Sequence, residues 1–170
     1  LKMYQLRADV IIEEVDVQVT IGLFKKPRGA FIDPRSKKLG WRQYDFEHSG
    51  QKNIPFLDRE NYDKLRVEHC IPETGIELIK EQTFILEAGF TRLSGVSFTK
   101  GCFIGQEVTA RMRHKTELQK GLVKVRLLGD LNTSETDIIA GGKVVGKLHT
   151  RVDDYAIAFL KFKYEKDDLT

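Results

Sequence analysis

The segment of this chain best suited to chemistry is 100–107, Lys-Gly-Cys-Phe-Ile-Gly-Gln-Glu. Cys102 lies between two glycines and two residues after Lys100. Apolar residues then recur at every fourth position, as on one face of a helix: Ile104, Val108 and Met112. A free thiol has a pKa of about 8.5, and both a helix N-terminus and a nearby ammonium group favour its anion. We therefore predict that Cys102 lies in a turn just before a helix and that Lys100 helps to activate its thiol.

Other chemical interpretations of these residue types are weaker. A lone cysteine is most often a small buried apolar side chain, and this is the interpretation we give to Cys70. There is no Cys-x-x-Cys pair and the four histidines are scattered, so the sequence predicts no metal site. A nucleophilic pair of a cysteine and a histidine stays open, because such partners can be distant in the chain.

The composition is that of a folded chain with one concentrated positive region. Of the 170 residues 41% are apolar, and Lys and Arg exceed Asp and Glu by 28 to 25, too little for a protein that coats nucleic acid. Residues 100–126 hold seven basic and two acidic residues, a balance of +5. This region would attract phosphate, a polyglutamate tail or RNA, although solvated helix and strand faces have the same composition. Two cysteines indicate a reducing compartment, and neither a membrane helix nor a signal peptide is predicted.

The first part of the chain is a series of strands followed by helices, which favours an α+β fold. Alternation of apolar and polar residues predicts a strand over 15–21, and a second strand is predicted over 39–46. We predict one helix with Asn61 as its N-cap and another with Pro72 in its first turn.

From Lys120 onward the pattern is typical of a small β-barrel or sandwich. Apolar and polar residues alternate over 123–127 and again over 155–164. Gly141-Gly142 predicts a tight turn between strands. We place a boundary between two domains near 115–119.

The octapeptide 100–107 resembles the signature of the YgfZ family, folate-binding proteins that support iron–sulfur enzymes. The mitochondrial Iba-type iron–sulfur maturation factors belong to the same family. Other segments resemble the family in the expected order: Tyr4-Gln5-Leu6-Arg7 before Val10, Asp33-Pro34-Arg35 before Leu39-Gly40-Trp41-Arg42, and Tyr62 with Arg66. The resemblance covers nearly the whole chain but only the later part of a family member, so we expect the family's N-terminal part to be missing. It implies a ferredoxin-like or T-protein-like α+β domain over 1–117, which includes the Lys-Gly-Cys motif, and a small C-terminal β-barrel over 118–170.

The family is related to the T-protein of glycine cleavage, a tetrahydrofolate-dependent aminomethyltransferase. Leu86-Glu87-Ala88-Gly89 is similar to the T-protein stretch whose glutamate holds the pterin ring. A carboxylate can accept parallel hydrogen bonds from the amino group and the ring N–H of a pterin. A surface carboxylate is the plain alternative for Glu87.

The resemblance implies two sets of site residues. Cys102 and Lys100 form the reactive pair. The residues implied to bind tetrahydrofolate or another folate derivative are Arg7, Glu87, Gly101, Phe103, Gln106, Glu107 and Arg111. Three residues depart from the family's usual ones: Cys70 stands for glycine, Phe103 for tyrosine and Gly89 for asparagine.

Three functions remain open. The resemblance implies a folate-binding accessory protein for iron–sulfur cluster assembly or repair, and thereby for tRNA-modifying iron–sulfur enzymes, rather than a conventional enzyme. The second function is aminomethyl transfer, but the T-protein lacks the Lys-Gly-Cys motif and its catalytic aspartate belongs to the N-terminal part. The third is RNA binding, for which the basic segment offers only Phe103 as a stacking aromatic.

The first function also implies partners and a location. Folate and iron–sulfur scaffold or client proteins would be the partners, with weak or indirect contact to tRNA and no membrane. A monomer is expected, in the cytoplasm or, in a eukaryote, in the mitochondrial matrix.

Overall fold

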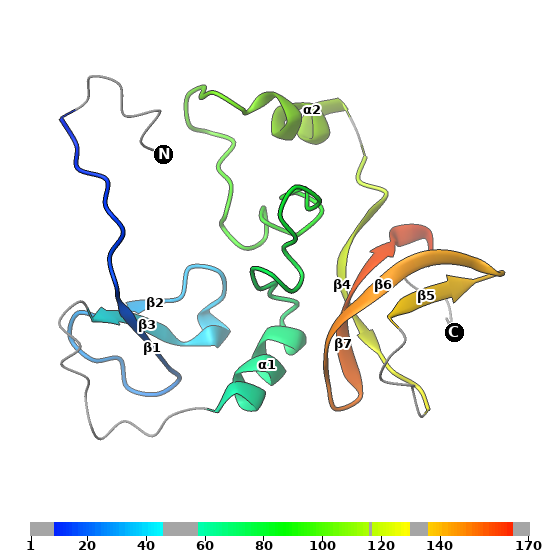
Figure 1. Ribbon diagram of the computed structural model, residues 1–170, viewed down its shortest axis with the longest axis horizontal. Coiled ribbons are helices and arrows are strands. Elements are labelled where there is room, and N and C mark those ends of the chain that lie inside the picture. Colours follow the sequence, from blue (N-terminus) through cyan, green and yellow to red (C-terminus); the bar gives the residue numbers. More distant parts are fainter. Residues whose placement is uncertain (1–8, 46–57, 116, 130–135, 165–170) are drawn as a thin grey trace.

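The computed structural model describes residues 9–45, 58–115, 117–129 and 136–164. The chain runs from a three-stranded sheet through a central part with two helices to a four-stranded sheet (Figure 1). The helices and strands in chain order are β1 (Gln18–Gly22), β2 (Phe31–Ile32), β3 (Trp41–Asp45), α1 (Arg59–Glu68), α2 (Glu107–Lys115), β4 (Lys120–Arg126), β5 (Asp137–Ala140), β6 (Lys143–Val152) and β7 (Tyr155–Lys161). The mixed α and β content predicted from the sequence is confirmed.

The first sheet is antiparallel, in the order β1-β3-β2. Both strand predictions in this part are confirmed, with shifted ends. β1 begins at Gln18 rather than at residue 15, and β3 begins at Trp41 because Lys37–Leu39 forms a short 3-10 helix that ends at Gly40. The ring of Trp41 is buried, and its indole N–H donates to the carbonyl oxygen of Phe24 at 3.1 Å.

A buried carboxylate joins this sheet to α1. The side chain of Asp33 is 1% exposed and accepts hydrogen bonds from Arg35 Nη2 at 2.9 Å and Arg42 Nε at 2.6 Å. Both guanidinium groups also donate to the hydroxyl oxygen of Tyr62, a residue of α1. Burial alone would raise the pKa of Asp33, but hydrogen bonds from Arg35 and Arg42 outweigh it and hold that pKa below its usual value. The Asp-Pro-Arg and Leu-Gly-x-Arg segments therefore position the sheet on the helix.

Helix α1 begins three residues earlier than predicted. Its N-cap is Asp58, whose carboxylate accepts a hydrogen bond from the backbone N–H of Asn61 at 2.8 Å. The prediction of Asn61 as the N-cap is therefore wrong. Aspartate and asparagine cap equally well, and the negative charge of Asp58 is favoured at the positive end of the helix dipole.

The C-terminal end of α1 is closed by a left-handed residue, Cys70, at a φ of 50°. Its backbone N–H donates to the carbonyl oxygen of Val67 at 3.1 Å, in the Schellman pattern. Arg92 covers this helix end by donating to the carbonyl oxygens of His69 and Cys70 at 2.9 and 2.7 Å. The left-handed backbone favours glycine, which is the residue expected here from the family resemblance.

The predicted second helix, beginning at Pro72, is wrong. Residues 71–94 contain only turns and one isolated bridge. The backbone N–H groups of three successive residues, Ile76, Glu77 and Leu78, all donate to the carbonyl oxygen of Glu73. The carboxylate of Glu77 is buried and accepts the backbone N–H of Glu73 at 2.9 Å, so it holds a compact turn instead of facing solvent on a helix.

Arg66, whose side chain is fully buried, is the centre of a hydrogen-bond network. Its guanidinium group donates to Asp63 Oδ1 at 2.8 Å, the carbonyl oxygen of Ile71 at 3.0 Å, Glu77 Oε2 at 3.2 Å and Thr150 Oγ1 at 3.0 Å. Glu77 also accepts hydrogen bonds from the backbone N–H and the hydroxyl group of Thr150. Since Thr150 belongs to β6, this Arg66–Glu77 network fixes α1 and the central turns to the C-terminal sheet.

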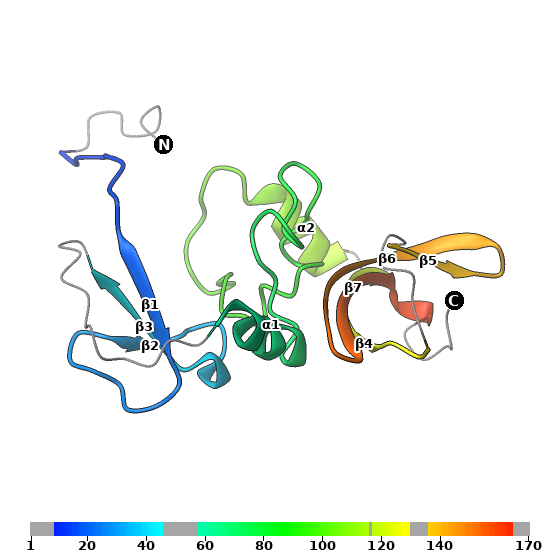
Figure 2. The same ribbon diagram turned by 60° about the horizontal axis from the view of Figure 1, so that its bottom comes forward.

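The C-terminal sheet is antiparallel, in the order β4-β7-β6-β5, and it curves strongly (Figure 2). Gly141 and Gly142 have φ values of 55° and 72°, as the predicted two-residue hairpin turn between β5 and β6 requires. The buried core of this sheet consists of Ile138, Val145, Ala158 and Leu160. One detail differs from prediction: Phe162–Tyr164 forms a 3-10 helix rather than the end of β7.

Candidate functional site

The loop before α2 contains the predicted turn, and the predicted helix follows it. Gly105 has a φ of 92°, and α2 starts at Glu107. The carbonyl oxygen of Gln106 accepts the backbone N–H of Ala110 at 2.8 Å, and its side-chain oxygen accepts the backbone N–H of Phe103 at 3.3 Å. Gln106 therefore holds the turn against the first turn of the helix.

This loop exposes a thiol, a ring and a cation together. Cys102 is exposed, and Phe103 beside it is 50% exposed. Lys100 Nζ lies 4.5 Å from the centroid of the Phe103 ring, a cation–π contact. Cys102 therefore has the solvent exposure that a reactive thiol needs. The activation of its thiol by Lys100 stays a prediction.

We expect Cys102 to react with iodoacetamide at least about tenfold faster than Cys70 at pH 7. Cys102 is exposed, whereas burial raises the pKa of the half-buried Cys70 thiol and so lowers its thiolate fraction at this pH. Mass spectrometry of the alkylated peptides measures both rates in one sample. Cys102→Ser should leave only the slow reaction, and equal or slower labelling of Cys102 in the native protein would refute the expectation.

Glu87 lies in the central turns, and its shielded carboxylate is beside the start of β4. Its side chain is 9% exposed, and Lys120 Nζ lies 3.8 Å from Oε2. Burial raises the pKa of Glu87, and the charge of Lys120 opposes this rise. No N–H or O–H group of the described residues donates a hydrogen bond to the carboxylate, whereas the backbone oxygen of Glu87 accepts the N–H of Leu122 at 2.9 Å. The backbone is thus fixed, and both carboxylate oxygens keep acceptor capacity.

The other residues implied to bind folate are distributed less compactly. Gly101, Glu107 and Arg111 are exposed and Gln106 is half-buried. Arg7 lies outside the described residues. Within the described parts of the chain, no hydrogen bond, ion pair or ring contact joins Glu87 to the loop 100–107. The structure therefore brings Lys100, Phe103 and Gln106 together and leaves Glu87 in a separate group with Lys120.

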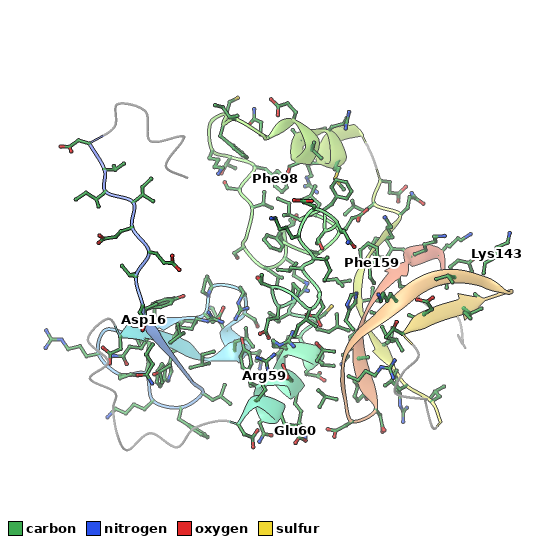
Figure 3. The ribbon with its side chains drawn as sticks, in the orientation of Figure 1. Asp16, Arg59, Glu60, Phe98, Lys143 and Phe159 are labelled. Atoms are coloured by element: carbon green, nitrogen blue, oxygen red, sulfur yellow. The ribbon has the colours of Figure 1, made fainter. Side chains whose placement is uncertain are left out.

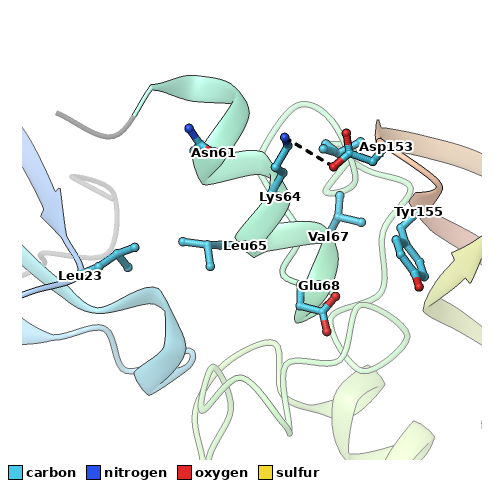
Figure 4. A pocket seen from close by; sticks show the side chains of 9 residues that line it. Leu23, Asn61, Lys64, Leu65, Val67, Glu68, Asp153 and Tyr155 are labelled. Carbon is cyan, nitrogen blue, oxygen red and sulfur yellow. Dashed lines mark ion pairs between the residues drawn. The ribbon is translucent and has the colours of Figure 1, made fainter.

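A cleft of about 430 Å³ lies along α1, between the loop after β1 and the turn between β6 and β7 (Figure 4). Its rim carries the ion pair of Lys64 Nζ with Asp153 Oδ2 at 3.5 Å. The lining residues are Leu23, Asn61, Lys64, Leu65, Val67, Glu68, Val152, Asp153 and Tyr155. None of these residues was predicted to bind a ligand. α1 supplies five of the lining residues, and the others come from distant segments of the chain.

No group of three or more His, Cys, Asp or Glu side chains in the described parts of the chain could hold a metal ion. None of the helices that the structure describes has the length and apolar character needed to cross a membrane.

Two comparisons with known proteins find similarity, one for the C-terminal part of the chain and one for most of its length. Residues 119–170 match the family model of the CAF17 C-terminal beta-barrel domain. The chain is 34% identical over 146 residues to the mitochondrial iron–sulfur cluster assembly factor IBA57 of Mus musculus, a match covering 81% of this chain and 40% of that protein. With the Homo sapiens protein of the same name it is 35% identical over 136 residues, covering 75% of this chain and 38% of that protein.

A fungal relative shows the same likeness over a shorter stretch. The IBA57 homologue of Phaeosphaeria nodorum is 39% identical over 70 residues, which are 41% of this chain and 17% of that protein. The chain spans about two fifths of the length of the mouse and human relatives that it matches. The relatives described here are all named IBA57. We conclude that residues 119–170 are similar to the CAF17 C-terminal beta-barrel domain, and that most of the chain is similar to proteins named iron–sulfur cluster assembly factor IBA57.

Proposed function

We propose that the full-length protein is an accessory factor for iron–sulfur cluster assembly, a member of the wider family that includes YgfZ and IBA57. The observation that carries this proposal is the likeness to the mouse and human factors over most of the chain. The iron–sulfur cluster is cargo rather than a resident cofactor, and the partners are scaffold or client proteins. In a eukaryote we place the protein in the mitochondrial matrix, and this proposal is supported by relatives that are named mitochondrial.

The exposed loop 100–107 is the part of this chain that acts on a partner or cluster. Cys102 offers a solvent-exposed sulfur, and the ammonium group of Lys100 lies in the same loop. The protein acts as a monomer and not as a conventional enzyme, and its contact with tRNA is weak or indirect.

Replacement in cells tests this function. Full-length protein expressed in human cells depleted of IBA57 should restore the activity of iron–sulfur enzymes, and Cys102→Ser should not. Cys70→Ser is the matched control, because it changes the other thiol. Loss of rescue by wild-type protein that accumulates to normal amounts would contradict the proposal.

Folate is the proposed ligand of Glu87, and the residue fits this role. A pterin needs a shielded carboxylate with two free acceptor oxygens, and Glu87 is nearly buried without a described hydrogen-bond donor. Lys120 keeps a positive charge near the carboxylate. The cleft along α1 does not include Glu87. We therefore propose that the remainder of the full-length protein completes the folate site.

Glu87→Gln should weaken the binding of folinic acid by about 5- to 150-fold, which corresponds to about 1–3 kcal/mol. The amide that replaces the carboxylate presents one acceptor and two donors, so it cannot accept both pterin hydrogen bonds. Isothermal titration calorimetry of the full-length protein measures the dissociation constant. Glu81→Gln, on an exposed side chain, should leave it unchanged.

Calorimetry also distinguishes a folate site formed by this chain alone from one that needs the rest of the full-length protein. Titration of the 170-residue chain beside the full-length protein shows whether the remainder is needed. An unchanged dissociation constant for Glu87→Gln would remove this residue from the site.

A further inference from the structure

The first strand of the C-terminal sheet, β4, lies directly against Glu87. The backbone N–H of Leu122 donates to the carbonyl oxygen of Glu87 at 2.9 Å. A Cβ added at Gly121 would lie 2.7 Å from the same oxygen, so the close approach needs glycine at this position. The backbone of Glu87 is therefore fixed to the strand on which Lys120 is the first residue.

The ammonium group of Lys120 contacts both the Glu87 carboxylate and an aromatic ring. Its Nζ is 3.8 Å from Glu87 Oε2 and 5.2 Å from the centroid of the Phe159 ring. Phe159 belongs to β7, the neighbour of β4 in the sheet, and lies next to the central turns (Figure 3). An aromatic ring attracts a cation to its face, so Phe159 limits the positions that the flexible lysine side chain can take.

This ion pair does not use up the acceptor capacity of the carboxylate. At 3.8 Å the contact between Lys120 and Glu87 is electrostatic and too long for a hydrogen bond. The Lys120 side chain is 45% exposed and that of Glu87 is 9% exposed, so the pair lies where a shielded carboxylate meets solvent. Lys120 thus supplies a positive charge without occupying an acceptor oxygen.

Lys120 opposes the effect of burial on the charge of Glu87. Burial raises the pKa of Glu87, and the positive charge of Lys120 lowers it. Protonation would turn one acceptor oxygen into a donor, and the carboxyl group could then no longer accept two N–H groups. Within the described residues, Lys161, opposite Lys120 on β7, forms no ion pair with Glu87, and Arg92 donates to backbone carbonyl oxygens at the end of α1 instead.

We propose that Lys120 is a positioning residue of the folate site, where it fixes the negative charge and the orientation of the Glu87 carboxylate. This inference rests on the proposed function, since folate is the proposed ligand of Glu87. The carboxylate accepts the amino group and the ring N–H of the pterin, and Lys120 acts through Glu87 without touching the ligand. Lys120 and Leu122 lie within residues 119–170, which match the barrel-domain model. The C-terminal barrel therefore helps to form the folate site instead of only supporting the fold.

A double-mutant cycle in ligand binding tests whether Lys120 acts through Glu87. Isothermal titration calorimetry of the full-length protein with folinic acid at pH 7 compares Lys120→Met, Glu87→Gln and the double variant. Lys120→Met should weaken binding about threefold, which is the size expected for a partly exposed ion pair. The double variant should bind no more weakly than Glu87→Gln alone, because Lys120 then has no carboxylate to act on.

The pH dependence of binding separates this role from a purely structural one. Without the charge of Lys120, burial raises the pKa of Glu87 further, so the carboxylate is protonated sooner as the pH falls. The loss of affinity caused by Lys120→Met should therefore grow from about threefold at pH 7 to about five- to tenfold at pH 5. Loss of packing alone would weaken binding by the same factor at both pH values.

Two control variants accompany these measurements. Lys161→Met removes an exposed cation from the neighbouring strand and should leave the dissociation constant unchanged at both pH values. Lys120→Gln, which keeps a polar end on the side chain, should behave like Lys120→Met. Circular dichroism verifies that every variant is folded at both pH values.

An unchanged dissociation constant for Lys120→Met, a loss that does not grow at pH 5, or an additive loss in the double variant would overturn the inference. So would an equal loss for Lys161→Met, which would mean unspecific attraction of the anionic ligand. A loss that disappears with formyltetrahydropteroate, which lacks the glutamate tail, would mean that Lys120 binds this tail directly. If the wild-type full-length protein did not bind folinic acid, the folate site itself would be wrong, and this result is distinguishable from all the others.

Discussion

Arg66→Met is expected to lower the free energy of unfolding by about 3–5 kcal/mol. The Arg66 side chain has no exposed surface, and the Glu77 side chain with which it pairs is equally buried. Methionine fills the space of the arginine stem but leaves the Glu77 carboxylate without its cation. Removing one partner of a buried ion pair costs far more than the pair itself contributes, because the remaining charge stays desolvated. Urea denaturation followed by fluorescence measures the change.

The matched control for this prediction is Arg59→Met on the same helix. Arg59 also pairs with two carboxylates, Asp63 and Glu73, but its side chain is 58% exposed. Water replaces such partners easily, so the loss should be no more than about 1 kcal/mol. Similar losses at Arg59 and Arg66 would contradict the placement of Arg66 in the protein interior.

Gly40→Ala should destabilise the protein by about 2–5 kcal/mol. The φ of Gly40 is 74°, and an added Cβ would lie 2.0 Å from the backbone oxygen of Gly22. The conformation costs about 1–2 kcal/mol for a residue with a Cβ, and displacement of the neighbouring strand adds about 1–3 kcal/mol. Thermal and urea denaturation both report this loss.

Gly29→Ala separates the two contributions. Gly29 has a φ of 84° but no atom within 4 Å of an added Cβ. Its substitution should therefore cost only the conformational part, about 1–2 kcal/mol. If Gly40→Ala lowered the free energy of unfolding no more than Gly29→Ala, Gly40 could not lie as close to the backbone of Gly22 as the structure shows.

Local signals in the sequence were sufficient for the elements that depend on local contacts. The turn at Gly105, the helix after it and the hairpin at Gly141-Gly142 are set by residues within a few positions of one another. The helix predicted from Pro72 failed for the opposite reason. Glu77 is held by Thr150, which is 73 residues away, and periodicity cannot reveal a buried carboxylate whose partners come from another sheet.

In the candidate site, too, features set by nearby residues could be predicted, and features set by distant residues could not. The exposure of Cys102 could be predicted from its glycine-flanked turn, since a turn before a helix faces solvent. The shielding of Glu87 depends on Lys120 and the N–H of Leu122, which only the fold brings near. The cleft along α1 was not predictable, because Leu23, Leu65 and Tyr155 come from three separate segments.

The distance along the chain between Arg66 and Thr150 has a consequence for protein synthesis. The hydrogen bond between their side chains spans 84 residues. At about 5–20 residues per second, the ribosome needs about 4–17 s to make Thr150 after Arg66. During this interval the nascent helix carries a guanidinium group whose burial is not complete. A premature stop codon between the codons for Cys70 and Thr150 therefore leaves Arg66 of α1 without this partner as well as shortening or removing the C-terminal sheet. Such shortened products would be substrates for chaperones and proteases.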